Sequence, residues 1–314
     1  MVFFVDGVGL GAADPATNPM AAARLPVLES LLEGRGPFLT EAPFSGALAS
    51  LVGVDAQLGV PGVPQSGTGH ATLLTGEDGV RAFGRHFGPW VPTALRPLVV
   101  RRSMLARARM GGLEVAFANA YPEELVERLP PGPDAVIAGR HLGPLRAGPP
   151  LAAIGAGVLT RHTAALERGR AVASEITNDG WIERLGRRAL SEVTPEEAGA
   201  NLAAIVARND LTLFAHYTPD HVGHRGDFDD AVVAVERVDR FLAGLIPALP
   251  AETLLLLVSD HGNIEDVRRE HTDNPALGLA VGPGHADVAR SLHDLRDVTP
   301  AVLRALGVDG VRGA

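Results

Sequence analysis

Residues 2–9 read VFFVDGVG, an apolar run that stops abruptly at Asp6 and is followed by two glycines. A short run that is apolar at every position is typical of a strand buried on both faces of a sheet. Residues 211–215 and 253–258 repeat this design, and each is followed by a segment rich in His and Asp. Three such strands predict a parallel sheet of an α/β fold, whose sites form in loops at the carboxyl ends of the strands.

Helical patterns lie between these strands, at residues 19–32, 195–207 and 229–245. The second pattern begins with Thr194, Pro195, Glu196 and Glu197, which supply an N-cap, a first-turn proline and acids that face the helix dipole. The alternation of buried strands and helices predicts a three-layer sandwich, with helices on both faces of a central, mainly parallel sheet.

Residues 81–189 differ from their surroundings because Pro and Gly are frequent and Arg is clustered. We expect them to form a smaller inserted cap over the site, which leaves residues 1–80 and 190–314 as the core. Within the insertion, residues 113–118 have the pattern of a strand that follows a helix at 103–110. This strand could belong either to the main sheet or to the cap.

The composition narrows the classes of partner. The 314 residues are 46% hydrophobic, and 37 acidic residues against 28 basic ones, all Arg, give a net charge of −9. An acidic chain without basic runs argues against nucleic acid or an anionic membrane as partner. No cysteine is present, which excludes disulfides and thiolate sites. Because the start lacks signal-peptide features and no apolar run is long enough for a membrane span, we expect a soluble, cytoplasmic protein of undetermined oligomeric state.

Two polar loops carry residue types that bind metal ions. Asp220 and His224 are four residues apart after one strand, while Asp260 and His261 follow another, with His271 ten residues further on. Carboxylate and imidazole ligands suit Mn, Fe or Zn. Each loop alone also has a simpler explanation, as a solvated acidic loop or a salt-bridged turn. Their occurrence together in one chain favours metal binding.

The segment QSGTGH at residues 65–70 precedes an apolar helix start. Free backbone N–H groups at a helix N-terminus attract phosphate, which makes the hydroxyl of Ser66 a candidate nucleophile. Taken alone, the segment is better explained as a capping turn in which Ser66 or Thr68 is the N-cap.

In their order along the chain, these residues resemble the cofactor-independent phosphoglycerate mutases of the alkaline phosphatase superfamily. The resemblance covers roughly residues 1–80 and 190–314, and it rests on Asp6, Ser66 four residues before His70, Asp220 with His224, Asp260 with His261, and the HTDNP segment at 271–275. It implies an alkaline-phosphatase-like core and two divalent ions. One ion would be held by Asp6, Ser66, Asp260 and His261, and the other by Asp220, His224 and His271.

The resemblance also implies a mechanism. A Ser hydroxyl beside a divalent ion loses its proton near neutral pH, so Ser66 would attack a phosphoryl group and form a phosphoserine intermediate. We expect Mn as the metal and Zn as the alternative. The mutases carry a larger inserted domain with several Arg and a Lys in the site, and this chain has no Lys. Here Arg81, Arg85 and His86 are the candidates for contacts with the phosphate of a small phosphorylated substrate.

Three functions remain open at this point. The first is a metal-dependent phosphatase. It is favoured because weak binding of the dephosphorylated intermediate would leave water as the acceptor of the phosphoryl group. The second is a phosphomutase of the phosphoglycerate mutase type. The third is a non-catalytic metal-binding protein, against which Ser66 argues because a structural site has no use for a nucleophile.

Overall fold

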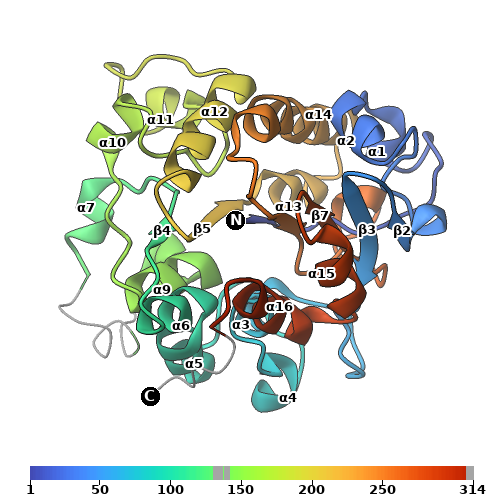
Figure 1. The fold of residues 1–314 in the computed structure, drawn as a ribbon, viewed down its shortest axis with the longest axis horizontal. Helices are drawn as coiled ribbons and strands as arrows, with labels where there is room; N and C mark the ends of the chain where they lie inside the picture. The colour runs from blue at the N-terminus through green and yellow to red at the C-terminus, as the bar shows by residue number, and fades with distance from the viewer. Residues whose placement is uncertain (130–136, 138–141, 309–314) are drawn as a thin grey trace.

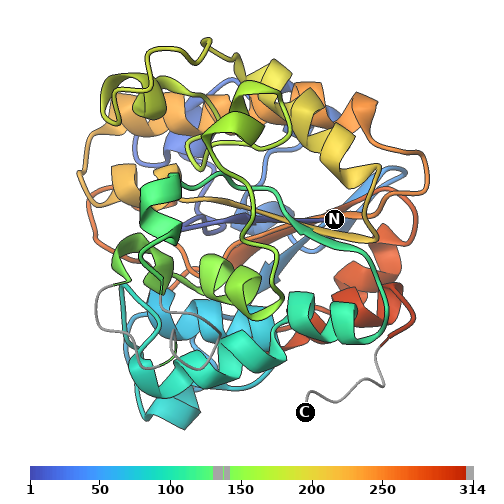
Figure 2. The same cartoon turned by 90° about the vertical axis from the view of Figure 1, so that its left-hand side faces the viewer.

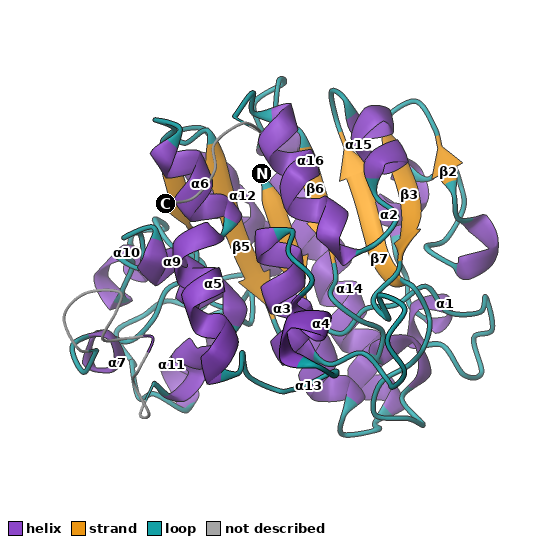
Figure 3. Cartoon of the chain, turned by 90° about the horizontal axis from the view of Figure 1, so that it is seen from below, coloured by secondary structure: helices purple, strands orange, loops and turns teal. Residues whose placement is uncertain are grey.

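The computed structural model describes residues 1–129, 137 and 142–308. Within these residues, seven strands form one sheet in the order β2-β3-β7-β6-β1-β5-β4 (Figure 3). The strands are β1 Val2–Val5, β2 Phe44–Ser45, β3 Ala49–Val54, β4 Val115–Phe117, β5 Leu211–His216, β6 Leu255–Val258 and β7 Ala276–Val281.

Strand β1 occupies the centre of the site-bearing half of the sheet. Its Val2 pairs in parallel with Leu213 of β5 on one side and with Leu256 of β6 on the other, and β4 extends the parallel set beyond β5. Strand β7 runs antiparallel to both β6 and β3, and β2 is antiparallel to β3. The sheet is therefore mixed, and the predicted parallel arrangement is confirmed for the strands that precede Asp6, Asp220 and Asp260.

Alternating side chains of the sheet enter two different cores, which produces three layers (Figure 2). Phe3 and Val5 of β1 pack with one set of helices, while Val2 and Phe4 pack with the other. The first layer contains α1 Pro19–Ala22, α2 Pro26–Leu31, α12 Pro195–Val206 and α14 Phe228–Leu245. The opposite layer contains α3 Ser66–Thr75, α4 Gly79–Phe83, α5 Arg96–Arg102, α6 Met104–Met110, α9 Gly148–Gly155, α15 His285–Ser291 and α16 Val298–Ala305. The predicted sandwich is confirmed.

Two of the three expected helices form as predicted. The N-cap of α12 is Thr194, whose hydroxyl accepts from the N–H of Glu197 in a capping box, and α14 spans the third expected range. The expected helix at 19–32 is instead broken into α1 and α2. The break occurs because Pro26 disfavours helical backbone at the residue before it, and Leu25 is indeed the N-cap of a new helix.

Residues 81–189 contribute to two parts of the molecule. Strand β4 pairs with β5, so the 113–118 segment belongs to the main sheet. Helices α5, α6 and α9 share the core beneath the sheet with α3. The short helices α7 Glu123–Val126, α10 Thr163–Glu167 and α11 Asp179–Glu183 gather on the side of the molecule away from α1 and α2 (Figure 1). The division into a core and an inserted cap stays a prediction.

None of the helices in the described ranges has both the length and the apolar character needed to cross a bilayer.

Candidate metal centre and nucleophile

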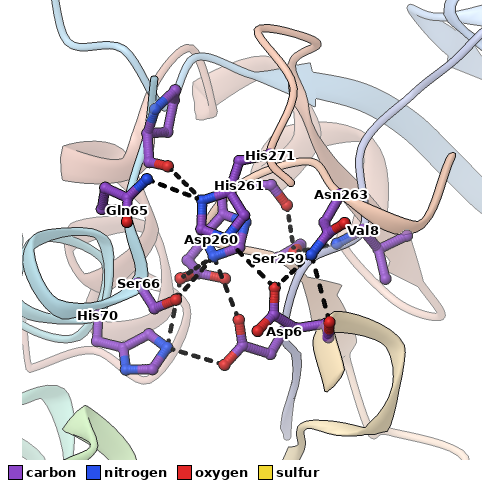
Figure 4. A network of polar contacts seen from close by, with 12 residues as sticks. Asp6, Val8, Gln65, Ser66, His70, Ser259, Asp260, His261, Asn263 and His271 are labelled. Atoms are coloured by element: carbon purple, nitrogen blue, oxygen red, sulfur yellow. Dashed lines mark hydrogen bonds and ion pairs between the residues drawn. The ribbon is translucent and has the colours of Figure 1, made fainter. Parts of the chain in front are cut away.

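Three neighbouring strands deliver the acidic and imidazole side chains to one edge of the sheet. Asp6 follows β1, Asp260 and His261 lie just after β6, and Asp220 lies in α13 Thr218–Gly223, directly after β5. Because β1 lies between β5 and β6, these loops are neighbours, and the side chains of Asp6, Asp260 and His261 point toward one another (Figure 4). The predicted convergence of these segments is what the parallel pairing produces.

The first cluster of possible ligands contains Asp6, Asp260 and His261, all buried, with ligand atoms within 4.8 Å of one another. The Nε2 atom of His261 is 3.4 Å from Oδ1 of Asp6 and 3.5 Å from Oδ2 of Asp260. Such spacing is close enough for all three side chains to contact one cation.

The second cluster contains Asp220, His261 and His271, again buried and within the same span. Oδ1 of Asp220 is 3.5 Å from Nε2 of His271 and 3.5 Å from Nε2 of His224. The rings of His261 and His271 are stacked with centroids 4.0 Å apart. His261 thus lies between the two clusters, whereas the sequence assigned it to the first alone.

The carboxylates of the first cluster are buried with few protein partners. Burial, followed by repulsion from Asp6 and Asp220, raises the pKa of Asp260 well above its ordinary value. Both carboxylate oxygens of Asp260 and Oδ1 of Asp6 have no hydrogen-bond partner among the described residues. Buried charges without partners are costly, and a divalent ion would neutralise them. The donor set therefore fits a metal centre.

Two further candidate ligands, His261 and Asp220, have pKa shifts that suit metal binding. Burial and the nearby His271 lower the pKa of His261 to about 4, so its ring is neutral near pH 7. Burial opposes ionisation of Asp220, but hydrogen bonds and charge from His271, His261 and Asn263 lower its pKa overall. Asp220 is therefore a carboxylate over the physiological range.

Ser66 and Thr68 have different surroundings, although both lie in the first turn of α3. Oγ of Ser66 is 2.9 Å from Nε2 of His261, inside the first cluster. The Thr68 hydroxyl instead accepts from the N–H of Phe87, and the N–H of Thr68 donates to the Phe87 carbonyl. Thr68 therefore anchors the 87–90 segment to the helix, while Ser66 faces the carboxylates.

Sequence reasoning did not assign a role to His70, which the structure places at the same cluster. Its Nε2 is 3.3 Å from Oδ2 of Asp6 and 3.3 Å from Oδ2 of Asp260. Its Nδ1 accepts a hydrogen bond from the N–H of Gly148, so Nε2 carries the proton of the neutral ring. The ring therefore lies against both carboxylates, although Nε2 makes no hydrogen bond to another described residue. The four-residue spacing from Ser66 already placed both side chains on one helix face.

Sequence reasoning also missed Glu265, a buried residue that holds together the loops around the candidate metal centre. Its carboxylate accepts from the N–H groups of Gly9 and Asn263 and from the Thr272 hydroxyl. A Cβ on Gly9 would lie 2.2 Å from Oε1 of Glu265, so glycine is required there. Nothing in the spacing of the sequence singles out Glu265, because it pairs with segments distant along the chain.

A cavity of about 720 Å³ opens beside the clusters and is lined by Asp6, Ser66, His70, Asp220 and His224 at one end. Arg81, Arg85 and His86 do not line it. Arg81 pairs with Asp78 on the surface, and Nε2 of His86 is 3.1 Å from the carbonyl of Val60. The structure does not bring these three side chains to the clusters, and their assignment as phosphate contacts stays a prediction.

Parts of this chain are similar in sequence to known proteins. A family model described as the Metalloenzyme superfamily matches residues 189–310. The 2,3-bisphosphoglycerate-independent phosphoglycerate mutase of Halobacterium salinarum is 41% identical over 109 residues, which are 32% of this chain and 22% of that protein. The mutase of Haloarcula marismortui is 34% identical over 126 residues, 37% of this chain and 24% of the relative. The chain thus spans about a quarter or less of these relatives.

Among solved structures, the PH0037 protein of Pyrococcus horikoshii has a TM-score of 0.55 at 13% identity, covering 100% of this chain and 98% of that chain. At this identity the likeness shows a shared fold. By sequence, residues 189–310 match the metalloenzyme superfamily, and the chain is partly similar to the 2,3-bisphosphoglycerate-independent phosphoglycerate mutases.

Proposed function

We propose that this protein is a metal-dependent phosphoric-ester hydrolase that acts on a phosphorylated small molecule through a phosphoserine at Ser66. The observation that carries the proposal is the 2.9 Å separation between Oγ of Ser66 and Nε2 of His261, within a cluster of unpartnered carboxylates. A hydroxyl among metal ligands is the arrangement expected of a nucleophile, and a structural metal site would not require it.

Two divalent ions are proposed, one held by Asp6, Ser66, Asp260 and His261, the other by Asp220, His224 and His271. When bound, they would offset the buried negative charge, lower the pKa of the Ser66 hydroxyl and attract phosphoryl oxygens. Mn is the proposed metal and Zn the alternative, because both accept mixed oxygen and nitrogen ligands.

The chain's own residues supply orientation. Nε2 of His70 lies 3.3 Å from Oδ2 of Asp6 and from Oδ2 of Asp260, and α3 begins at Ser66, so the helix dipole favours negative charge at this hydroxyl. Ser66 attacks the phosphorus atom, the alkoxide of the ester leaves, and water then cleaves the phosphoserine to release phosphate.

Hydrolysis is favoured over phosphomutase action by the charges around the cavity. A mutase must retain its dephosphorylated intermediate, yet Arg184 and Glu175 already form an ion pair with each other, and Glu124 pairs with Arg187. Phosphomutase action remains the second candidate because the curated relatives are mutases.

The two candidates differ in their product. Purified, Mn-loaded protein is incubated with a panel of phosphorylated metabolites while free phosphate and isomerised ester are measured together. Release of phosphate supports the hydrolase, and isomer without phosphate supports the mutase. Neither product with any metal, from folded protein that binds two ions, would contradict both.

A further inference from the structure

The cavity beside Ser66 is lined by two kinds of residue. Candidate metal ligands line part of it, and most of the remaining lining is aromatic or aliphatic, from Trp90, Tyr121, Trp181, Tyr217, Leu125 and Leu185. These side chains come mainly from segments 89–90, 120–128 and 174–185, which are remote in sequence from the metal ligands.

The aromatic residues are concentrated here beyond what the composition would suggest. The whole chain has two Trp and two Tyr, and aromatic residues make up 4% of it. All four Trp and Tyr side chains line this one cavity. Such residues provide large apolar faces that contact planar rings in stacked or edge-on geometry.

Local contacts hold these rings in place. A Cβ on Gly67 would lie 2.2 Å from the carbonyl oxygen of Trp90, so the Trp90 backbone is packed directly against the turn that carries Ser66. The Arg146 guanidinium lies 4.9 Å from the Trp90 ring centre. Tyr121 stacks on Phe117 of β4 at 6.1 Å. The wall is therefore pre-formed, which reduces the ordering cost of binding.

The charged groups on the same wall are mostly engaged already. Arg184 pairs with Glu175, and Glu124 pairs with Arg187, while Arg128 is the one Arg or Glu of the wall that has no ion pair among the described residues. A small, multiply charged ester such as phosphoglycerate would find few partners beyond the metal centre. A volume of about 720 Å³ is within the usual range for pockets that enclose larger organic ligands.

We infer that the substrate is a phosphate monoester whose organic group carries a planar aromatic ring, which binds against half-buried Trp90 and the small exposed parts of Tyr121 and Trp181 while the phosphate lies at Ser66. This inference rests on the proposed function for the position of the phosphate. The ring can come from an aryl alcohol or from a nucleoside, and both present the same flat apolar face to the wall.

Binding is tested without turnover, because both tryptophans of the chain line the cavity and their emission reports on it directly. Metal-loaded protein is titrated with benzylphosphonate and with methylphosphonate, which share the phosphonate and differ in the ring. We expect benzylphosphonate to change the emission and to bind about tenfold more tightly, the scale of one aromatic contact with its buried area. Equal affinities would overturn the inference whether or not the protein is a phosphatase.

Turnover is tested with benzyl phosphate, ethyl phosphate and adenosine 5′-monophosphate, all of which release an alkyl alcohol. The ratio of kcat/KM for benzyl over ethyl phosphate should be about ten or more and should fall severalfold in Trp90→Ala, with recovery in Trp90→Phe. Phe44→Ala, which removes an aromatic ring at the far edge of the sheet, is the matched control. A preference for the nucleotide assigns the ring to a nucleoside, and equal rates on benzyl and ethyl phosphate overturn the inference.

The two proposals fail separately. Discrimination between the phosphonates without hydrolysis of any ester would contradict the phosphatase and keep the aromatic cavity. Phosphate release at equal rates from all esters would keep the phosphatase and remove the aromatic cavity.

Discussion

The candidate metal centre and the aromatic wall line one cavity, and they are built in different ways. Asp260 and His261 have no exposed surface and follow a central strand of the sheet, whereas Trp90 is half-buried in a loop. The centre is fixed by parallel pairing among β5, β1 and β6. The wall is fixed by short helices and loops. We thus assign the proposed chemistry to residues that follow sheet strands, and the proposed choice of substrate to helices and loops, which vary most easily.

The largest effect that separates the centre from the wall is expected from Ser66→Ala. Loss of the nucleophile should reduce kcat by several orders of magnitude, about 10⁴-fold or more, because the rest of the centre cannot form the phosphoserine. Affinity for benzylphosphonate should change much less. Steady-state kinetics and the fluorescence titration measure the two quantities.

Thr68→Ala is the matched control for Ser66→Ala, since both hydroxyls are in one helical turn. Its effect should be milder and should fall on binding, because Thr68 anchors the segment that carries Trp90. Full activity in Ser66→Ala would show that another group is the nucleophile.

Removal of a ligand should affect one ion and spare the fold. Asp220→Ala or His271→Ala is expected to lower the affinity for one of the two ions by at least about a hundredfold. This is the largest loss usually caused by mutating residues that only support metal ligands, and a ligand itself should matter at least as much. Metal analysis after equilibrium dialysis counts the ions. Two ions at wild-type affinity in either variant would refute the assignment of the second cluster.

In the ion-free protein, ionisation of the buried Asp260 should lower the free energy of unfolding as the pH rises. Its pKa in the fold lies above the ordinary value of 3.8, so the stability it contributes is fully present at low pH. That contribution is lost as the pH rises from 3.8 through the folded pKa, since the unfolded chain ionises first.

Asp260→Asn removes this penalty. With chelator present, its free energy of unfolding should exceed the wild-type value by about 1–4 kcal/mol near neutral pH, the range seen when buried ionic groups are replaced. The gain should shrink toward acid pH. Urea denaturation at several pH values measures it, and a gain that is constant with pH would contradict the assigned cause. The same variant should lose stabilisation by added metal.

A smaller effect is expected from Gly67→Ala, because Gly67 follows Ser66 and packs against the backbone of Trp90. The new Cβ would meet the Trp90 carbonyl at 2.2 Å, so the wall must shift while Ser66 keeps its helix position. Overpacking of this kind costs about 1–3 kcal/mol. KM for an aromatic ester should rise more than kcat falls. A larger loss in kcat than in KM would mean that the backbone of Ser66 has moved as well.

The sequence predicted the candidate metal centre better than the wall. Asp6, Asp220 and Asp260 each come soon after an apolar run that reads as a strand. Their meeting at one edge of the sheet could be predicted, because parallel strands bring their carboxyl ends together. His70 was predictable from helical spacing but was not assigned. Glu265 and Trp90 were not predictable, since their roles depend on contacts between segments far apart along the chain.

The most direct test of the account is to trap the covalent intermediate. Metal-loaded enzyme is mixed with a turned-over ester, quenched in acid within milliseconds and digested for mass spectrometry of the 65–75 segment. The account predicts phosphate on Ser66, present with substrate and metal and absent in chelator or in Ser66→Ala. Phosphate on Thr68, or turnover with no phosphorylated residue at any quench time, would contradict it.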